Sequence, residues 1–132
     1  MAVGNADVLR TDPEGWRVTD RMAQVVVSDG VAYLSGVVPT DPSGELIGPG
    51  DAEAQARASL DNIEAVLAAA GTTLDNILRA TCYATTQEAA LAYMAERTRR
   101  MKNRPAATTI LVSGTLVPGA MMEIEVIARV PR

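Results

Sequence analysis

The sequence contains no histidine, no phenylalanine and only one cysteine, Cys82. Without histidine, the chain can form neither a nucleophile activated by an imidazole nor a histidine-bound zinc site. One cysteine excludes an intramolecular disulfide and a cysteine-cluster metal site, and this usage is typical of a reducing compartment such as the cytoplasm. We therefore expect a cytoplasmic protein without a metal, in which any catalysis relies on carboxylates, hydroxyls, backbone groups or bound water.

Aromatic residues and positive charge are also scarce. One tryptophan and three tyrosines leave few surfaces on which nucleic-acid bases could stack. The formal net charge of -4 disfavours a partner rich in phosphate. No apolar run reaches the roughly 18 to 20 residues that span a bilayer, and the chain has neither a Walker A nor a GxGxxG pattern. We expect no nucleic-acid partner, no membrane segment and no cofactor.

The composition is that of an ordinary globular protein, with 132 residues of which 48% are hydrophobic and 21% are charged. We expect a single domain over residues 1–132. Asp29-Gly30 separates two runs rich in β-branched residues, 22–28 and 31–36. This dipeptide predicts a two-residue hairpin, because both central positions of a type I′ turn need φ > 0. Residues 38–50 carry three prolines and three glycines, which predicts a long surface loop.

Apolar residues recur at helical spacing over residues 51–70, and Gly71 predicts the end of that helix. A short helical turn at 74–78 leads into a strand at 79–85. Thr85 and Glu88 form a capping-box pattern that predicts the start of a second helix, which Pro105 ends. Further strands are predicted at 108–113 and 121–130.

This order of elements predicts an α+β two-layer sandwich, in which two helices cover one face of a mixed sheet of four to six strands. The other face has no helix to cover it. Other copies of the same chain are the expected cover, in a closed ring.

Three groups of residues could carry chemistry. Glu123 shares a strand face with Glu125 and Arg129, where a carboxylate could hold a water molecule, or Glu125 and Arg129 could pair on a solvated face. The five basic residues within 97–104 could bind phosphate, but cations at the end of a helix also offset its dipole without any ligand. Cys82 is expected to be a buried, inert thiol.

Three segments together resemble the Rid (reactive intermediate deaminase, or YjgF) family. They are YLSGVVPTDPSGELIGPGDAEAQARASLDNIEAVLAAAG at 33–71, RPAATTILV at 104–112 and VPGAMMEIEVIARV at 117–130. The resemblance implies a chorismate-mutase-like fold, a homotrimer, and small-molecule clefts between adjacent subunits. It also implies hydrolysis of reactive enamines or imines, with a cation for the substrate carboxylate and a carboxylate that holds water.

The family pattern is only partly kept. Glu123 matches the water-holding glutamate, and the resemblance places Ser35, Gly36 and Thr109 against the ligand. Ala107 stands where active members carry the carboxylate-binding arginine, and Thr109 replaces a cysteine that is frequent there. Met22 and Ala90 stand at the places of a site tyrosine and a site asparagine.

The leading hypothesis is a hydrolase without the usual arginine, acting on an imine or enamine that lacks the usual amino-acid carboxylate. Glu123 would position water, and the site would be lined by Ser35, Gly36, Thr109, Met22, Ala107 and Ala90. The alternative is a non-catalytic trimer that binds a small molecule or a partner protein. Ribonuclease activity, attached to some relatives, has little support in a chain without histidine; RNA cleavage sensitive to Arg99→Glu and Arg100→Glu would establish it.

Overall fold

Six strands form one mixed sheet in the computed structural model, which describes residues 8–132. The sheet order is β1-β2-β3-β6-β4-β5. Only β4 and β5 run parallel, and the other neighbouring strands are antiparallel. The strand bounds are β1 Leu9–Thr11, β2 Val25–Ser28, β3 Val31–Leu34, β4 Ile77–Ala84, β5 Ala106–Leu111 and β6 Met122–Arg129.

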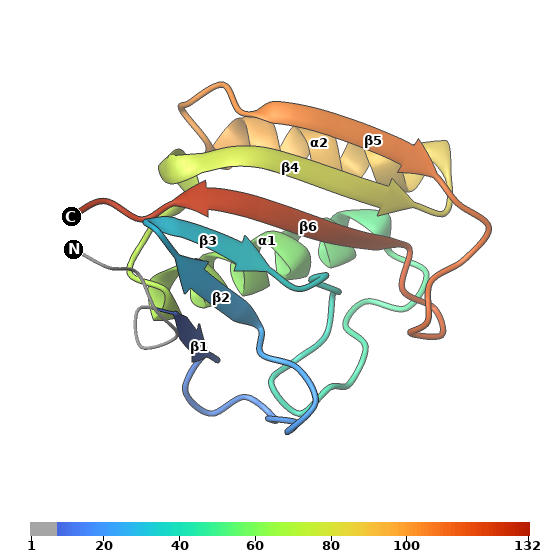
Figure 1. Cartoon of the computed structure of the whole chain (residues 1–132). Helices are drawn as coiled ribbons and strands as arrows, with labels where there is room; N and C mark the ends of the chain where they lie inside the picture. The colour runs from blue at the N-terminus through green and yellow to red at the C-terminus, as the bar shows by residue number, and fades with distance from the viewer. Residues whose placement is uncertain (1–7) are drawn as a thin grey trace.

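The helices α1 (Ala52–Ala69) and α2 (Gln87–Arg100) both lie behind the sheet in Figure 1. Within residues 8–132, the front face of the sheet carries no helix. This arrangement confirms the expected α+β two-layer fold. No helix in the same range is both long and apolar enough to cross a membrane.

The β2–β3 hairpin turns at Asp29 and Gly30, whose φ angles are 52° and 75°. Ser28 pairs directly with Val31, so the two residues between them form the whole turn. Positive φ at both positions is the requirement of a type I′ turn, and the sequence-based prediction is confirmed.

Side-chain caps fix where both helices begin. Asp51 accepts a hydrogen bond from the Ala54 amide (3.0 Å) at the start of α1. At α2 the capping residue is Thr86, which accepts from the Ala89 amide (3.0 Å), so the predicted cap at Thr85 is wrong by one residue. Thr85 is still held by the sheet, because its amide donates to the Met121 carbonyl (2.9 Å).

Other boundaries differ modestly from the predictions. The strand β1 was not expected from the sequence. The strand expected at 108–113 is β5, which begins and ends two residues earlier, and the helical turn expected at 74–78 is the 3₁₀ segment Leu74–Asn76.

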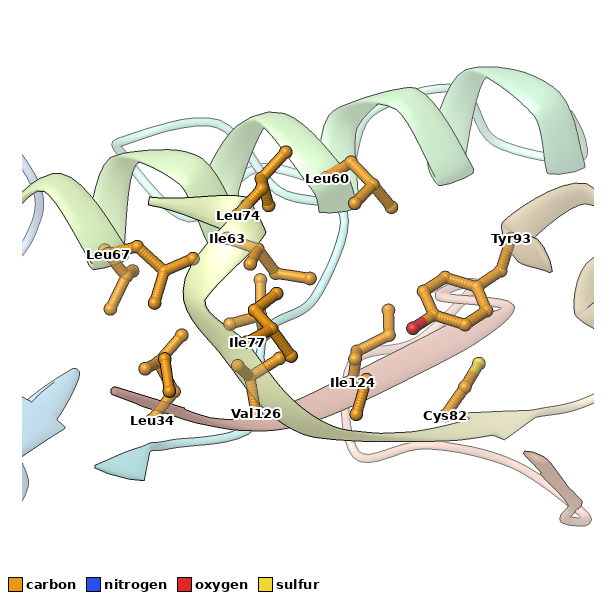
Figure 2. Packing of buried hydrophobic residues seen from close by; sticks show 14 of the residues in the cluster. Leu34, Leu60, Ile63, Leu67, Leu74, Ile77, Cys82, Tyr93, Ile124 and Val126 are labelled. Carbon is orange, nitrogen blue, oxygen red and sulfur yellow. The ribbon is translucent and has the colours of Figure 1, made fainter. Parts of the chain in front are cut away.

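The hydrophobic core lies between the helices and the sheet (Figure 2). Leu60, Ile63 and Leu67 of α1 point toward the strands, and Tyr93 of α2 lies over Cys82 of β4. Tyr93 is the largest of the fully buried side chains. A core of this kind leaves the opposite sheet face and the β5 edge available for other contacts.

Candidate functional site

A β-bulge at Ser35 and Gly36 shapes the end of β3. Tyr33 pairs with Ile127 of β6, whereas the next bridge joins Val37 to Ile124. β3 and its extension therefore hold one residue more than β6 between these two pairs, which is the definition of a bulge. The bulge brings the backbone of Gly36 against the side chain of Glu123.

The Glu123 carboxylate occupies the space where Gly36 lacks a side chain. A Cβ atom on Gly36 would lie 2.1 Å from Oε2 of Glu123 and 2.8 Å from its Cδ. Glu123 is half-buried, and no group within residues 8–132 donates a hydrogen bond to its carboxylate. Both oxygens are therefore available to accept hydrogen bonds from a water molecule or a ligand.

Glu125, the second glutamate of β6, accepts a hydrogen bond from a protein side chain. The Tyr83 hydroxyl donates a hydrogen bond to Oε1 of Glu125 (2.7 Å). This hydrogen bond, assisted by desolvation and the negative charge, raises the pKa of Tyr83. Glu125 makes this bond and no ion pair with Arg129 within the described residues, unlike the pairing considered from the sequence. Of the two carboxylates, Glu123 is the one with free acceptor capacity.

Ser35 anchors the segment that precedes β2. Its hydroxyl donates to the Ala23 carbonyl (2.7 Å), and its amide donates to the Gln24 carbonyl (2.9 Å). The Gln24 amide in turn donates to Asp12 (3.0 Å). The Ser35 oxygen can still accept a hydrogen bond from a ligand, but its proton is committed to the backbone.

Two cavities flank the bulge. One, of about 280 Å³, is lined by Gly36 together with Trp16, Arg17 and Gln24. The other, of about 530 Å³, is lined by Ser35 and by Met22, whose side chain is about half exposed. Met22 therefore lies near Ser35. The sequence reading missed Trp16 and Arg17, because nothing in their own segment indicates that the loop folds back onto residues 36–44.

The residues predicted from the strand β5 lie on the other face of the sheet. Ala107 pairs with Ala80 and Thr109 pairs with Cys82, and paired residues of neighbouring strands share a face. Cys82 is fully buried under α2, so Ala107 and Thr109 point to the helix side, whereas Glu123 lies on the side without helices. Ala90 is buried in the hydrophobic core. A single chain thus places Gly36 against Glu123 and Ser35 beside Met22, whereas Ala107, Thr109 and Ala90 lie on the helix side of the sheet.

Another cavity, of about 1000 Å³, lies elsewhere, on the outer surface between the first turns of α1 and the length of α2. None of the predicted site residues lines it. Glu96 lines this cavity. Its side chain is buried and forms ion pairs with Arg99 and Arg100. Arg100 also donates to Asp61 (2.7 Å) and Glu64 of α1 (3.0 Å), so these ion pairs join the two helices.

Other chemistry is limited by burial and by spacing. Burial raises the pKa of the Cys82 thiol to about 12, and the positive charge of Arg97 opposes this rise. The thiol is therefore unreactive at neutral pH. No three cysteine or acidic side chains within residues 8–132 come together as a potential metal site.

Comparison with known proteins assigns the chain to a family. A family model described as Endoribonuclease L-PSP matches residues 17–130. A RutC family protein of Pyrococcus horikoshii is 32% identical over 114 residues, covering 80% of this chain and 84% of the relative. The crystal structure of YyfA, a Rid family protein of unknown function from Yersinia pestis, is 33% identical, with a TM-score of 0.82 over 93% of this chain and 99% of that one.

A more distant structure supports the fold alone. The yeast protein YEO7 has a TM-score of 0.85 at 20% identity, covering 94% of this chain and 99% of its own. The family model, the two relatives of more than 30% identity and the shared α+β fold agree with one another. The chain therefore belongs to the Rid family, also called the YjgF or L-PSP family.

Proposed function

We propose that this chain hydrolyses an imine or enamine, with Glu123 as the residue that holds and activates water. The observation that carries the proposal is the half-buried Glu123 carboxylate, which lies against Gly36 and has no protein donor within residues 8–132. A carboxylate with free oxygens can accept a proton from water as the water attacks a carbon atom. Glu125, held by Tyr83, is less suited to this role.

The reaction balances with water as the only co-reactant. An enamine first takes a proton from solvent on its β-carbon and becomes an iminium ion. Water then adds to the C=N carbon and gives one proton to Glu123, which forms a neutral carbinolamine. Glu123 returns that proton to nitrogen, the C–N bond breaks as ammonia leaves, and the hydroxyl proton passes back to solvent as the C=O bond forms.

In this proposal a second copy of the chain completes the cleft. Glu123 and Thr109 lie on opposite faces of one sheet, so one small molecule cannot contact both within a single chain. β5 is an edge strand without a buried residue, and Ile110 and Leu111 are 41% and 61% exposed. Exposed apolar edges of this kind are normally covered. A homotrimer, as the family resemblance implies, would place the β5 edge of one copy against the Glu123 side of the next.

The strand β5 provides no cation to such a cleft. Ala107 is exposed on the helix side of the edge strand, and a methyl group cannot bind a carboxylate as a guanidinium does. Ala107→Arg would restore a cation at this place. The variant therefore tests whether the remainder of the cleft can carry out hydrolysis.

The experiment uses a pyridoxal-phosphate dehydratase to generate 2-aminocrotonate, and it follows release of 2-oxobutanoate with and without this protein. We expect acceleration by the native chain or by Ala107→Arg. In the active form, we expect a loss of at least about a hundredfold with Glu123→Gln. Glu125→Gln is the matched control, because it changes a neighbouring carboxylate on the same strand face. Equal effects of the two substitutions would refute the role of Glu123, and inactivity of both chains would favour the non-catalytic binding protein.

A further inference from the structure

A groove runs along the helix layer between the first turns of α1 and the length of α2. It is the cavity of about 1000 Å³ described above, and it lies away from the face of the sheet that carries no helix (Figure 1). Ala52, Ala92 and Ala95 line it with small apolar side chains, and Leu91 beside them is 56% exposed. Since Glu123 and its surroundings do not line this groove, the proposed function leaves it unused.

The charges of the groove are separated along its length. Glu53 and Glu88 lie in the first turns of α1 and α2, whereas Arg57 and Arg99 lie farther along the same helices. Acidic first turns and basic last turns also stabilise a helix through its dipole, so this polarity alone requires no partner. A docked helix of the same polarity, however, matches these charges only when it runs in the opposite direction.

The groove-facing side of α2 is complementary to itself in that orientation. Glu88, Ala92, Ala95 and Arg99 follow one another at intervals of four, three and four residues, which places them on one helix face. Because these intervals read the same in both directions, two antiparallel copies of α2 can place Glu88 opposite Arg99 twice and Ala92 opposite Ala95 twice. The two charge pairs then lie about 16.5 Å apart along the helices, with the alanines between them.

Both charged ends of this stripe have bonding capacity left. Glu88 is exposed and forms no ion pair among the described residues. Arg99 binds Glu96 through one nitrogen, and its side chain is 66% exposed. A guanidinium has five N–H donors, so Arg99 can bind a second carboxylate. At the centre of the stripe, alanine side chains allow two helix axes to approach to about 8 Å.

We propose that a second copy of this chain docks in the groove, with the two α2 helices antiparallel about a two-fold axis between Ala92 and Ala95. One surface patch then serves both partners, as a two-fold interface requires. A different protein would have to bring the complementary order of charges, whereas this chain already carries it. Burial of Leu91 and packing of the alanines supply attraction, and the exposed ion pairs determine direction and register.

This inference does not rest on the proposed function. The groove lies on the helix layer, so the contact leaves the other face of the sheet and the β5 edge free. If the chain forms the homotrimer that the family resemblance implies, the contact joins two trimers. The expected observation is therefore a doubling of mass, whatever the smaller assembly is.

The test measures the mass of the full chain by sedimentation velocity over a series of protein concentrations. At high concentration we expect the native chain to have twice the mass of Ala95→Arg, which inserts a long charged side chain between the two helices. Ala95 is exposed and arginine is a good helix former, so this variant should fold. Thr98→Arg is the matched control, because it adds the same side chain to an exposed position of α2 outside the groove, and it should double in mass as the native chain does.

Two charge reversals test the antiparallel direction. Glu88→Arg alone and Arg99→Glu alone each place like charges opposite one another, so each should weaken self-association about tenfold or more. An equimolar mixture of the two variants should regain the double mass. In that mixture one copy carries arginine at both positions and the other carries glutamate at both, so every pair across the interface is again of opposite charge.

An equal mass of the native chain and Ala95→Arg at every concentration would overturn the proposal. A mixture of Glu88→Arg and Arg99→Glu that fails to associate, while both variants keep the native circular dichroism spectrum, would overturn it as well. If Arg99→Glu fails to fold, because it loses the ion pair with Glu96, the comparison of Ala95→Arg with Thr98→Arg decides the question.

Discussion

The substitution Gly36→Ala tests the geometry of the Glu123 site most directly. The new Cβ atom would lie 2.1 Å from Oε2 of Glu123, far inside van der Waals contact, so one of the two groups must move. Oε2 is the end of a flexible side chain, and rotation of Glu123 is the easiest adjustment. We therefore expect a loss of stability of only about 1 kcal/mol, at the low end for overpacking.

Catalysis should suffer far more than stability. Displacement of a catalytic group by about 1 Å can reduce a rate about a hundredfold, and the clash requires a movement of that order. Hydrolysis of 2-aminocrotonate by Gly36→Ala should therefore fall about a hundredfold, while urea denaturation shows a small change. Gly114→Ala is the matched control, because a Cβ there would meet no atom within 4 Å.

The double variant Gly36→Ala/Glu123→Ala examines the cause of the stability change. Removal of the carboxylate removes the clash, so Gly36→Ala should have almost no effect on unfolding free energy in the Glu123→Ala background. If the effects of the two substitutions on the unfolding free energy are additive, the stability change comes from the backbone conformation at Gly36 and not from a clash with Glu123. Full activity of Gly36→Ala would refute the placement of Glu123 as the water-holding residue.

Three further outcomes follow from buried or hydrogen-bonded groups. Cys82, with its pKa raised to about 12, should resist alkylation by iodoacetamide at pH 8.5 in the native chain and react in urea, and equal rates would contradict its burial. Gln55→Leu should lower the unfolding free energy in urea by about 3 kcal/mol, because the Gln55 amide satisfies three backbone groups, and a loss below about 1 kcal/mol would contradict that account. The hydrogen bond that Tyr83 donates to Glu125 raises the pKa of Tyr83 in the folded chain. The contribution of this bond to folding stability is therefore complete below the ordinary tyrosine pKa of about 10, and it is lost as the pH rises through the raised pKa of the folded chain. Tyr83→Phe should therefore weaken the fall in stability above pH 10 in urea titrations, and an unchanged slope would exclude this contribution.

Local signals in the sequence were sufficient for most of the fold. Asp29-Gly30 predicted the hairpin because the turn type depends on two adjacent residues. The helix periodicity and Gly71 likewise predicted α1, whose end is followed by positive φ at Gly71. β1 was missed because three residues are too few for a periodic pattern, and its pairing with β2 is a tertiary contact.

The candidate site was only partly predictable, because the relative placement of its residues on different strands depends on the register of the sheet. Alternation along β6 placed Glu123 on the face away from the core residues, and the structure shows the same. The side to which Ala107 and Thr109 point depends on how β5 pairs with β4 across an intervening helix, which no local pattern determines. The contact between Glu123 and Gly36 also requires the bulge, which becomes visible only when β3 and β6 are aligned.

Arg97 shows why a run of like charges must be resolved by helix geometry. The sequence reading treated the basic segment 97–104 as one group that offsets the negative end of the helix dipole. That effect does favour a positive charge at Arg97, which lies in the last turn of α2. The dipole acts on charge, however, and supplies no acceptor for the buried Nη1 atom. Charge and hydrogen bonding are therefore separate requirements at this residue. The fold meets the first, whereas the buried Nη1 atom has no acceptor among the described residues.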